Sequence, residues 1–404
     1  MQLDFSGSLS GDVEPPDLGN YGNNSPTPAQ RAFREDSLRL REVLWSISSI
    51  ADVRKCGRVP CAHLLPVFEA GGEYRLGGLC RCHSVWLCPV CAPERRSARA
   101  SEIGLAVELH LVGGGGVEFG SATVRHGRGD RLCDTYSAVA RAWDSLNRNR
   151  GVVRFREAHG YWGFIRTVEI TWGVDNGWHP HVHWVDFWDS PLSDSDRAEY
   201  EALLYSAWSI RVVGLGMGLP LQPFAVRVLG VRADSVDAKS VGEYLTDMSP
   251  MAAAHELTSL STKQAKKHGL TPFGILWRIH DVGGMPWTGL WWEYEKATRG
   301  RRMLGTSRKI LERLGLPEED PDVFDRGRVV GFVDSEEWGR LRFFGGGLYG
   351  VQSIVESAAV DGQVGITEAM RVLLGGVVVP SQYGSGLAAA AVVELGPGDD
   401  GGMF

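Results

Sequence analysis

The segment from Glu169 to His183 constrains the fold of this chain more than any other part of its sequence. Residues that favour strands flank Asp175-Asn176-Gly177, which is strong turn chemistry, so the pattern predicts a tight β-hairpin. Strands followed by helices surround this hairpin. Together these patterns indicate an α+β domain with a mostly antiparallel sheet.

The two strands of the hairpin bring metal-binding residue types together. Side chains alternate along a strand, so His181 and His183 point to the same face. Centring the hairpin on Asn176 places Glu169 opposite His183 and Thr171 opposite His181, and cross-strand partners share a face. We therefore expect two imidazoles and one carboxylate to converge on one patch, as a divalent metal ion requires.

This arrangement favours a metal site over an ordinary pair of strand histidines. Two such histidines on a half-buried strand are, taken alone, more often structural or surface residues. The carboxylate of Glu169 changes that balance, and three protein ligands leave coordination positions open, as a catalytic site requires. A mixed imidazole and carboxylate set does not single out one metal. His179 lies on the same face nearer the turn, where it supports the ligands or the fold.

Hydrophobic patterning predicts the elements around the hairpin. Strands are expected at residues 117–126, 161–172, 179–188 and 223–231, and helices at 28–50, 91–111, 133–149, 192–211 and 236–248. The run Gly113–Gly116 marks a boundary before the first of these strands. Residues 250–313 are predicted to be helical and basic.

At 404 residues the chain is long enough for two or three domains. Shifts in composition predict their order. We expect a disordered leader (1–28), a helical and cysteine-rich zinc-binding region (29–112), an antiparallel-sheet core flanked by helices (113–250), a basic helical region (251–316), a small α/β appendage (317–375) and a low-complexity tail (376–404).

The cysteines are unevenly placed, since six of the seven lie between Cys56 and Cys91. The first residues are polar and acidic, unlike a signal peptide, and no stretch approaches the roughly 18 apolar residues of a membrane span. We therefore expect a cytoplasmic protein without a membrane partner, in which clustered cysteines bind metal more often than they form disulfides. Four thiolates in a tetrahedron would make a closed structural zinc site; idle buried thiols are the simpler alternative.

The total charge argues weakly against nucleic-acid binding, but its distribution does not. The net charge is -7, yet basic residues cluster locally, most densely from Arg299 to Arg313. Each basic run alone is more often a solvated face. Together with nearby tryptophans, which either stack on bases or pack in the core, the runs suit a protein that binds DNA phosphates. These tryptophans are Trp277, Trp287, Trp291 and Trp292.

Five sequence blocks follow one another as they do in a known family. They read GLCRCHSVWLCPVC, SATVRHGRGD, IRTVEITWGVDNGWHPHVH, VGEYLTDM and WWEYEKATRGRRMLGTSRKI. This series resembles the HUH endonucleases, with their histidine–hydrophobic–histidine motif, and specifically the rolling-circle plasmid replication initiators (Rep) of the actinomycete type. The resemblance runs from about Cys56 to Leu373, and the shared order is more specific than any single block.

The resemblance implies an HUH-type core and assigns the nucleophile to Tyr244. In this family the tyrosine hydroxyl attacks a DNA phosphodiester, giving a 5′-phosphotyrosine and a free 3′-OH, with Mg²⁺ or Mn²⁺ as the catalytic ion. Tyr205 and Tyr294 are the competing tyrosines. The family commonly has a lysine where this chain has Asp247, and Lys239 is a candidate substitute.

The resemblance also selects the zinc ligands and the DNA-binding residues. Cys82 matches the family's cysteine pattern, which favours the set Cys56, Cys82, Cys88 and Cys91 for structural Zn²⁺. Other members of the cluster remain alternatives, namely Cys61, Cys80, His63 and His83. The candidate DNA contacts are Arg125, Lys239, Arg299, Arg301, Arg302, Arg308 and Lys309.

These features predict a site-specific single-strand endonuclease and strand transferase that acts at a plasmid replication origin. Its partners would be single- and double-stranded origin DNA, with a host helicase and DNA polymerase. A relaxase or transposase with the same hairpin and tyrosine is the first alternative. The second is a zinc-stabilised DNA-binding regulator without catalysis, which would leave Glu169, His181 and His183 without a role.

Overall fold

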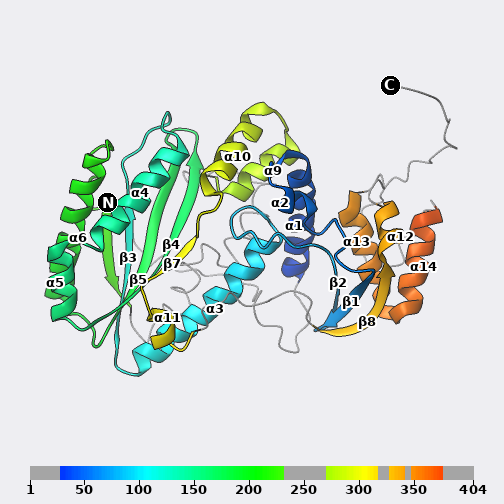
Figure 1. Cartoon of the computed structure of the whole chain (residues 1–404), viewed down its shortest axis with the longest axis horizontal. Coiled ribbons are helices and arrows are strands. Elements are labelled where there is room, and N and C mark those ends of the chain that lie inside the picture. Colours follow the sequence, from blue (N-terminus) through cyan, green and yellow to red (C-terminus); the bar gives the residue numbers. More distant parts are fainter. Residues whose placement is uncertain (1–27, 232–269, 317–326, 342–346, 376–404) are drawn as a thin grey trace.

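The computed structural model describes residues 28–231, 270–316, 327–341 and 347–375. These residues form helices and two antiparallel sheets, so the predicted α+β class is confirmed (Figure 1). Within this part of the chain no helix is both long and apolar enough to cross a membrane. The HUH-type assignment of the core stays a prediction.

The larger sheet has five antiparallel strands in the order β6-β3-β5-β4-β7. The predicted hairpin forms its centre. Strand β7 lies within the stretch for which the sequence predicted helix, and it gains its stability by pairing with β4. The strands are β3 (Gly116–Thr123), β4 (Tyr161–Gly173), β5 (Gly177–Trp188), β6 (Val226–Gly230) and β7 (Leu304–Thr306).

Three helices cover one face of this sheet, here called the helical face: α4 (Leu132–Leu146), α5 (Arg150–Ala158) and α6 (Asp194–Gly214). Buried apolar residues recur along α4 at spacings of three and four, as a helix with one buried side requires. They pack against Val182 and Trp184 of β5 and Val226 of β6. The sequence did not predict α5.

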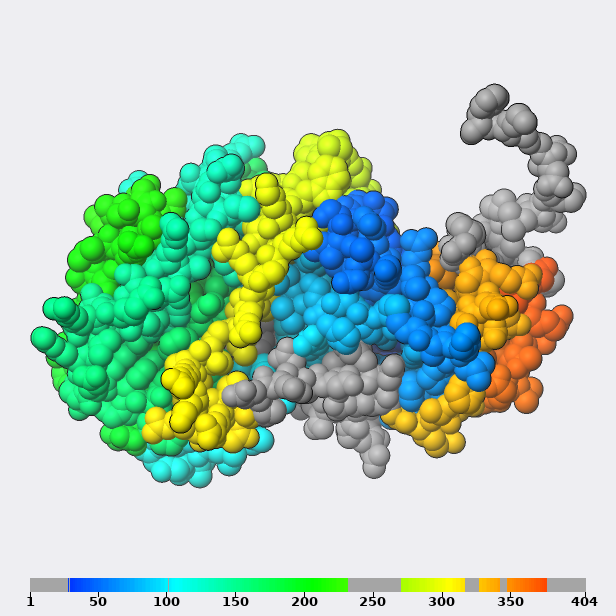
Figure 2. Space-filling model, viewed as in Figure 1, coloured from blue at the N-terminus to red at the C-terminus, as the bar shows by residue number. Residues whose placement is uncertain are grey.

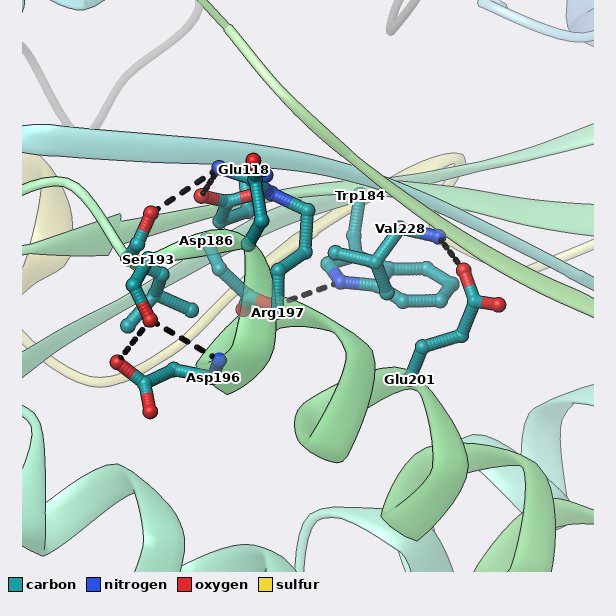
Figure 3. Close-up of polar contacts among 10 residues, drawn as sticks. Glu118, Trp184, Asp186, Ser193, Asp196, Arg197, Glu201 and Val228 are labelled. Carbon is teal, nitrogen blue, oxygen red and sulfur yellow. Dashed lines mark hydrogen bonds and ion pairs between the residues drawn. The ribbon is translucent and has the colours of Figure 1, made fainter.

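Polar contacts fix α6 against the sheet (Figure 3). Ser193 caps the helix by accepting a hydrogen bond from the Asp196 backbone N–H at 3.1 Å. Arg197 donates to the Glu118 carboxylate of β3 at 2.6 Å, and Glu201 accepts from the Val228 N–H of β6 at 2.7 Å. Glu118 is buried, so the Arg197 charge compensates a carboxylate that would otherwise be costly to bury.

The opposite face, here called the histidine face, changes character along β5. Phe187 and Val185 are fully buried and pack against Ile103 and Val107 of α3 (Cys91–Val112) and against the short helix α11 (Ile310–Arg313). Toward the hairpin turn the same row continues with His183 and then His181, where the side chains are polar. The apolar end therefore anchors the sheet, and the polar end carries the candidate site.

A further cluster packs beside the hairpin. It joins Val168, Ile170 and Trp178 of the hairpin to the helices α1 (Pro28–Ile47), α9 (Pro272–Asp281) and α10 (Met285–Thr298), with α2 (Ala51–Lys55) alongside. The Trp178 indole donates to the Glu293 carboxylate of α10 at 2.9 Å. The predicted N-terminal and basic helical regions thus both contact the predicted core.

A smaller module lies at the other end of the molecule from the large sheet, with its N-terminal strands in blue and its C-terminal elements in orange and red in Figure 2. Its sheet has the order β2-β1-β8, so a strand of the cysteine-rich region pairs with a strand of the C-terminal appendage. The predicted domain boundaries stay a prediction. The module comprises β1 (Leu64–Ala70), β2 (Glu73–Leu76), β8 (Arg328–Asp334), α12 (Ser335–Arg340), α13 (Gly347–Ala358), the 3₁₀ turn η3 (Ala359–Asp361) and α14 (Gly362–Gly375).

Candidate metal centres

In the β4–β5 hairpin Glu169 lies opposite His181, so the predicted pairing of Glu169 with His183 was wrong by two residues. The turn centres on Asp175, because Gly177 already pairs with β4 and has a φ of 71°. A short loop followed by a left-handed glycine is a common hairpin class. Since side chains alternate with a period of two, a two-residue shift leaves the three side chains on one face.

The predicted convergence of the three side chains is present. One carboxylate oxygen of Glu169, Oε2, lies 2.5 Å from His181 Nε2 and 3.0 Å from His183 Nε2. One donor atom from each residue lies within 4.8 Å of the others, a spacing that can hold a metal ion. The side chains of His181 and Glu169 are 15% and 21% exposed, and that of His183 is 4% exposed. The group is therefore mostly buried and open on one side.

Electrostatics hold Glu169 and His183 in states suited to binding a cation, whereas His181 has to give up its proton to a metal ion. Burial raises the pKa of Glu169, but the charges and hydrogen bonds of His181 and His183 outweigh it and keep that pKa well below its usual range. Burial and the neighbouring His181 lower the pKa of His183 to about 4. Burial also disfavours charged His181, yet Glu169 raises its pKa. An ionised carboxylate and a neutral imidazole are the forms that coordinate metals.

His179 continues the row of histidines toward the turn. Its partner is His126, which lies outside the hairpin and was not predicted from the sequence. His179, rather than His181, lies opposite Thr171, so that predicted pairing was also wrong. The Nδ1 of His179 contacts Nε2 of His126, and His126 Nδ1 lies 2.9 Å from the Asn176 carbonyl oxygen, to which it donates. Burial and the charge of His181 lower the pKa of His179 to about 3. The pair therefore supports the hairpin as neutral imidazoles.

Arg227 of β6 is a second residue that sequence reasoning missed. Ser121 of β3 pairs with His183 on one side and with Arg227 on the other, so all three occupy one row of the histidine face. Neighbouring strands lie about 4.8 Å apart, so the Cα atoms of Arg227 and His183, two strands apart, are separated by about 10 Å. Its side chain is exposed, and among the described residues it forms no ion pair. The alternation of Val226, Arg227 and Val228 in the sequence was the available signal.

The four cysteines favoured by the sequence also converge. Cys56 Sγ lies 3.7 Å from Cys88 Sγ and 3.5 Å from Cys91 Sγ, and Cys82 Sγ lies 3.8 Å from Cys91 Sγ. A tetrahedral zinc ion with Zn–S bonds of about 2.3 Å needs sulfurs about 3.8 Å apart, so the set fits a closed zinc site. Cys82 is half-buried and the other three are buried.

The charge state of these thiols points the same way. Hydrogen bonds from Cys82, Cys88 and Cys91, together with the charge of Arg41, lower the pKa of the Cys56 thiol well below its usual range. Burial and hydrogen bonds to the other thiols raise the pKa of Cys88 well above it. A thiol that ionises readily thus lies beside Cys88 and Cys91, whose raised pKa favours the protonated form. A divalent cation is what allows all four to ionise together.

The remaining two clustered cysteines do not serve as alternative ligands. Cys61 and Cys80 form a disulfide between Cα atoms 5.4 Å apart, which contradicts both the expectation that the cluster avoids disulfides and their role as substitute ligands. Backbone hydrogen bonds already place their strands together, because Cys61 N–H donates to Gly78 and Cys80 N–H to Val59. His63 and His83 are exposed and outside the group of four.

The predicted DNA contacts fall into different environments. Arg301 lies 4.2 Å over the Tyr136 ring and donates to Ser137 Oγ at 3.0 Å, so it stabilises the fold. Lys239 lies outside the described residues. Trp291 is fully buried and Trp277 nearly so, which makes these two core residues. The other predicted contacts are exposed, namely Arg125, Arg299, Arg302, Arg308 and Lys309.

The nucleophile predicted from the resemblance, Tyr244, also lies outside the described residues. Its two competitors have structural roles. Tyr294 is 1% exposed and donates its hydroxyl to the Trp86 carbonyl at 3.0 Å. Tyr205 donates to the Pro220 carbonyl at 3.2 Å. Neither lies in the row of strand residues that carries the histidines.

Comparison with known proteins places this arrangement in a class. The chain is 29% identical over 322 residues to the protein named "Protein rep" of Streptomyces lividans, covering 66% of this chain and 70% of that protein. It is 32% identical over 148 residues to a "Neomycin resistance protein" of Streptomyces cyanogenus, which covers 31% of this chain and 34% of that protein. No family model matches the chain, and no solved structure matches it significantly.

With its α+β fold, its cysteine cluster and its histidine–carboxylate group, the chain is similar over most of its length to a protein of the Rep class. The chain is a homologue of the Streptomyces lividans Rep protein in particular, and the recognition made from the sequence motifs is confirmed.

Proposed function

We propose that this protein initiates rolling-circle plasmid replication by nicking one strand at a double-strand origin. The observation that carries the proposal is the convergence of Glu169, His181 and His183 on one sheet face in a homologue of a Rep protein. A regulator that only binds DNA would have no use for a mostly buried, one-sided group of metal donors. Within the class, replication is favoured over conjugation or transposition by the Rep relative.

The donor set fits a hard or borderline divalent ion, because it combines a carboxylate oxygen with two imidazole nitrogens. Bound Mg²⁺ or Mn²⁺ supplies Lewis-acid polarisation of a phosphoryl oxygen. Glu169, His181 and His183 hold that ion at the polar end of the histidine face. Arg227, exposed in the same row, binds the neighbouring DNA phosphate and neutralises part of its charge.

The covalent step belongs to Tyr244. Its hydroxyl oxygen bonds to phosphorus and loses its proton, while the bond from phosphorus to the 3′ oxygen breaks and that oxygen takes up a proton. The products are a 5′-phosphotyrosine and a free 3′-OH, which primes a host polymerase. A phenol with a pKa near 10 is a weak nucleophile at neutral pH, so positioning and charge stabilisation have to supply the rate.

The remaining parts of the chain serve DNA binding and stability. We propose that the cysteine cluster holds a structural Zn²⁺ and that the exposed basic residues, with Lys239, bind backbone phosphates of origin DNA. A host helicase and DNA polymerase would complete the replication complex in the cytoplasm.

Incubation of supercoiled origin plasmid with the full chain and Mg²⁺ or Mn²⁺ tests the proposal. We expect nicked circles, and with a single-stranded origin oligonucleotide a denaturant-stable adduct that peptide mapping places on Tyr244. Tyr244→Phe should abolish the adduct and retain DNA binding, whereas the matched variant Tyr205→Phe should keep it. An adduct that persists in Tyr244→Phe would show that the nucleophile is misassigned. The absence of nicking under every metal condition would overturn the enzymatic function and leave the DNA-binding regulator.

A further inference from the structure

Arg41 of α1 is a buried cation beside the cysteine cluster. Its side chain is 1% exposed, and its guanidinium lies over the Trp45 ring at 5.4 Å. One guanidinium nitrogen donates to the Gln352 amide oxygen of α13 at 3.0 Å. The guanidinium also packs against Gly57, the residue after Cys56, where any Cβ would overlap it. Its position is therefore fixed from several sides.

No carboxylate among the described residues forms an ion pair with Arg41. Arg34, about two turns earlier on the same helix, forms an ion pair with Glu356 at 2.7 Å. The guanidinium lies instead against the backbone just after Cys56, where it packs on Gly57, and Trp45, whose ring it covers, donates to the Cys56 carbonyl at 3.0 Å. A buried charge is stable only when an opposite charge is close. Among the described residues, the cysteine cluster that begins at Cys56 can supply that opposite charge.

We propose that Arg41 is a positioning residue that neutralises a four-thiolate metal centre. Four thiolates around a divalent ion leave a net negative charge, which a fixed guanidinium offsets without occupying a coordination position. The inference rests on the proposed structural zinc and is independent of the nicking reaction. Partners of this kind, beyond the ligands themselves, commonly change metal affinity by about 10- to 100-fold.

Hydrogen bonds connect Arg41, and through it the cysteine cluster, to helix α13 and strand β2. Gln352, which accepts from Arg41, donates through its Nε2 to Glu356 Oε1 at 2.8 Å. Glu356 in turn accepts from the Leu76 N–H of β2 at 2.8 Å and from Arg34. A continuous buried network thus runs from the cysteines to α13 and the smaller sheet.

The test compares metal binding by three full-length variants with wild type. Arg41→Met removes the charge and keeps most of the volume, Arg41→Lys keeps the charge, and Arg39→Met removes a partly exposed cation of the same helix that pairs with Asp36 at 3.9 Å, outside this network. The readouts are Zn²⁺ affinity by chelator competition and the thiolate-to-Co²⁺ charge-transfer spectrum. We expect Arg41→Met to weaken Zn²⁺ binding by about 10- to 100-fold, with Arg41→Lys and Arg39→Met near wild type.

Replacing one thiolate by a neutral imidazole separates charge from packing. Cys82→His converts the centre to three thiolates and one imidazole, a known zinc set with one less negative charge. In the Cys82→His background, Arg41→Met should lower Zn²⁺ affinity less than it does in the four-thiolate protein. This comparison can still be made if Arg41→Met alone folds poorly. Equal affinities of wild type and Arg41→Met, or an equal loss in Arg39→Met, would overturn the inference. Wild-type protein without bound zinc would overturn it together with the zinc site.

Discussion

Replacing one buried zinc ligand is expected to remove the metal and much of the stability of the cysteine-rich region. In Cys91→Ser the sulfur that lies 3.5 Å from Cys56 Sγ and 3.8 Å from Cys82 Sγ is lost, so the tetrahedron of sulfurs loses one corner. The hydroxyl of serine is a far poorer zinc ligand than a thiolate. Without the metal ion, the three remaining cysteines are expected to be protonated, because thiolates are costly to bury.

The size of the effect follows from what the centre joins. Cys56 follows α2, Cys82 lies in the loop after β2, and Cys88 and Cys91 lie at the start of α3, so one ion would join three segments of the chain. Loss of a structural metal is among the few single-site changes that cost more than about 4 kcal/mol. In a unit of 150–250 residues, 4 kcal/mol lowers Tm by about 8–16 °C.

Thermal unfolding and elemental analysis of the same samples measure this effect. Cys133→Ser is the matched control, because Cys133 is a free, half-buried cysteine outside the group of four. We expect about one zinc per chain in wild type and in Cys133→Ser, and little in Cys91→Ser. Similar Tm values for the two serine variants, or wild-type protein with well under one zinc per chain, would refute the reasoning.

Three further expectations concern the large sheet. His183→Ala should abolish nicking while origin-duplex binding, measured by gel shift, survives; an unchanged nicking rate would end the metal assignment. Arg227→Gln should lower kcat/KM on a single-stranded origin oligonucleotide by about 10- to 150-fold, since a charge-assisted hydrogen bond contributes roughly 1.5–3 kcal/mol. Arg211→Gln, on the exposed side of α6, should leave kcat/KM unchanged. Gly120→Ala should cost about 1–3 kcal/mol in denaturant unfolding, because its Cβ would overlap the buried indole of Trp184, and a wild-type midpoint would contradict that clash.

Local patterns predicted the parts of the fold that depend on local physics. The hairpin followed from turn chemistry, and the shared face of Glu169, His181 and His183 followed from the period of a strand. The register did not, because Asp175-Asn176-Gly177 fits either a two-residue turn or a longer loop ending in a left-handed glycine, and only the surrounding sheet decides between them. The period of two meant that this error left the candidate site intact.

Long-range pairing was beyond the reach of local patterns. Nothing in Leu64–Ala70 indicates that it will pair with Arg328–Asp334, since the partner strand is remote in sequence. The three-residue strand β7 carries too few side chains for a period to be visible. The choice of four thiols among six came from the family pattern and not from local chemistry, and the disulfide between Cys61 and Cys80 was not predicted.

Helix α3 connects the cysteine cluster with the sheet that carries the histidine–carboxylate group. Its first residue, Cys91, belongs to the cysteine cluster, and its later residues Ile103 and Val107 pack against the apolar part of the β5 row that continues to His183. A helix of this length spans about 33 Å, so it carries positional order from the cysteine cluster to the sheet. A closed metal site stabilises without reacting, whereas an open one reacts at the expense of stability. In the proposed function, a closed zinc site at the start of α3 would stabilise the helix that packs against β5. The sheet could then carry the polar group of Glu169, His181 and His183, although this group adds no apolar packing.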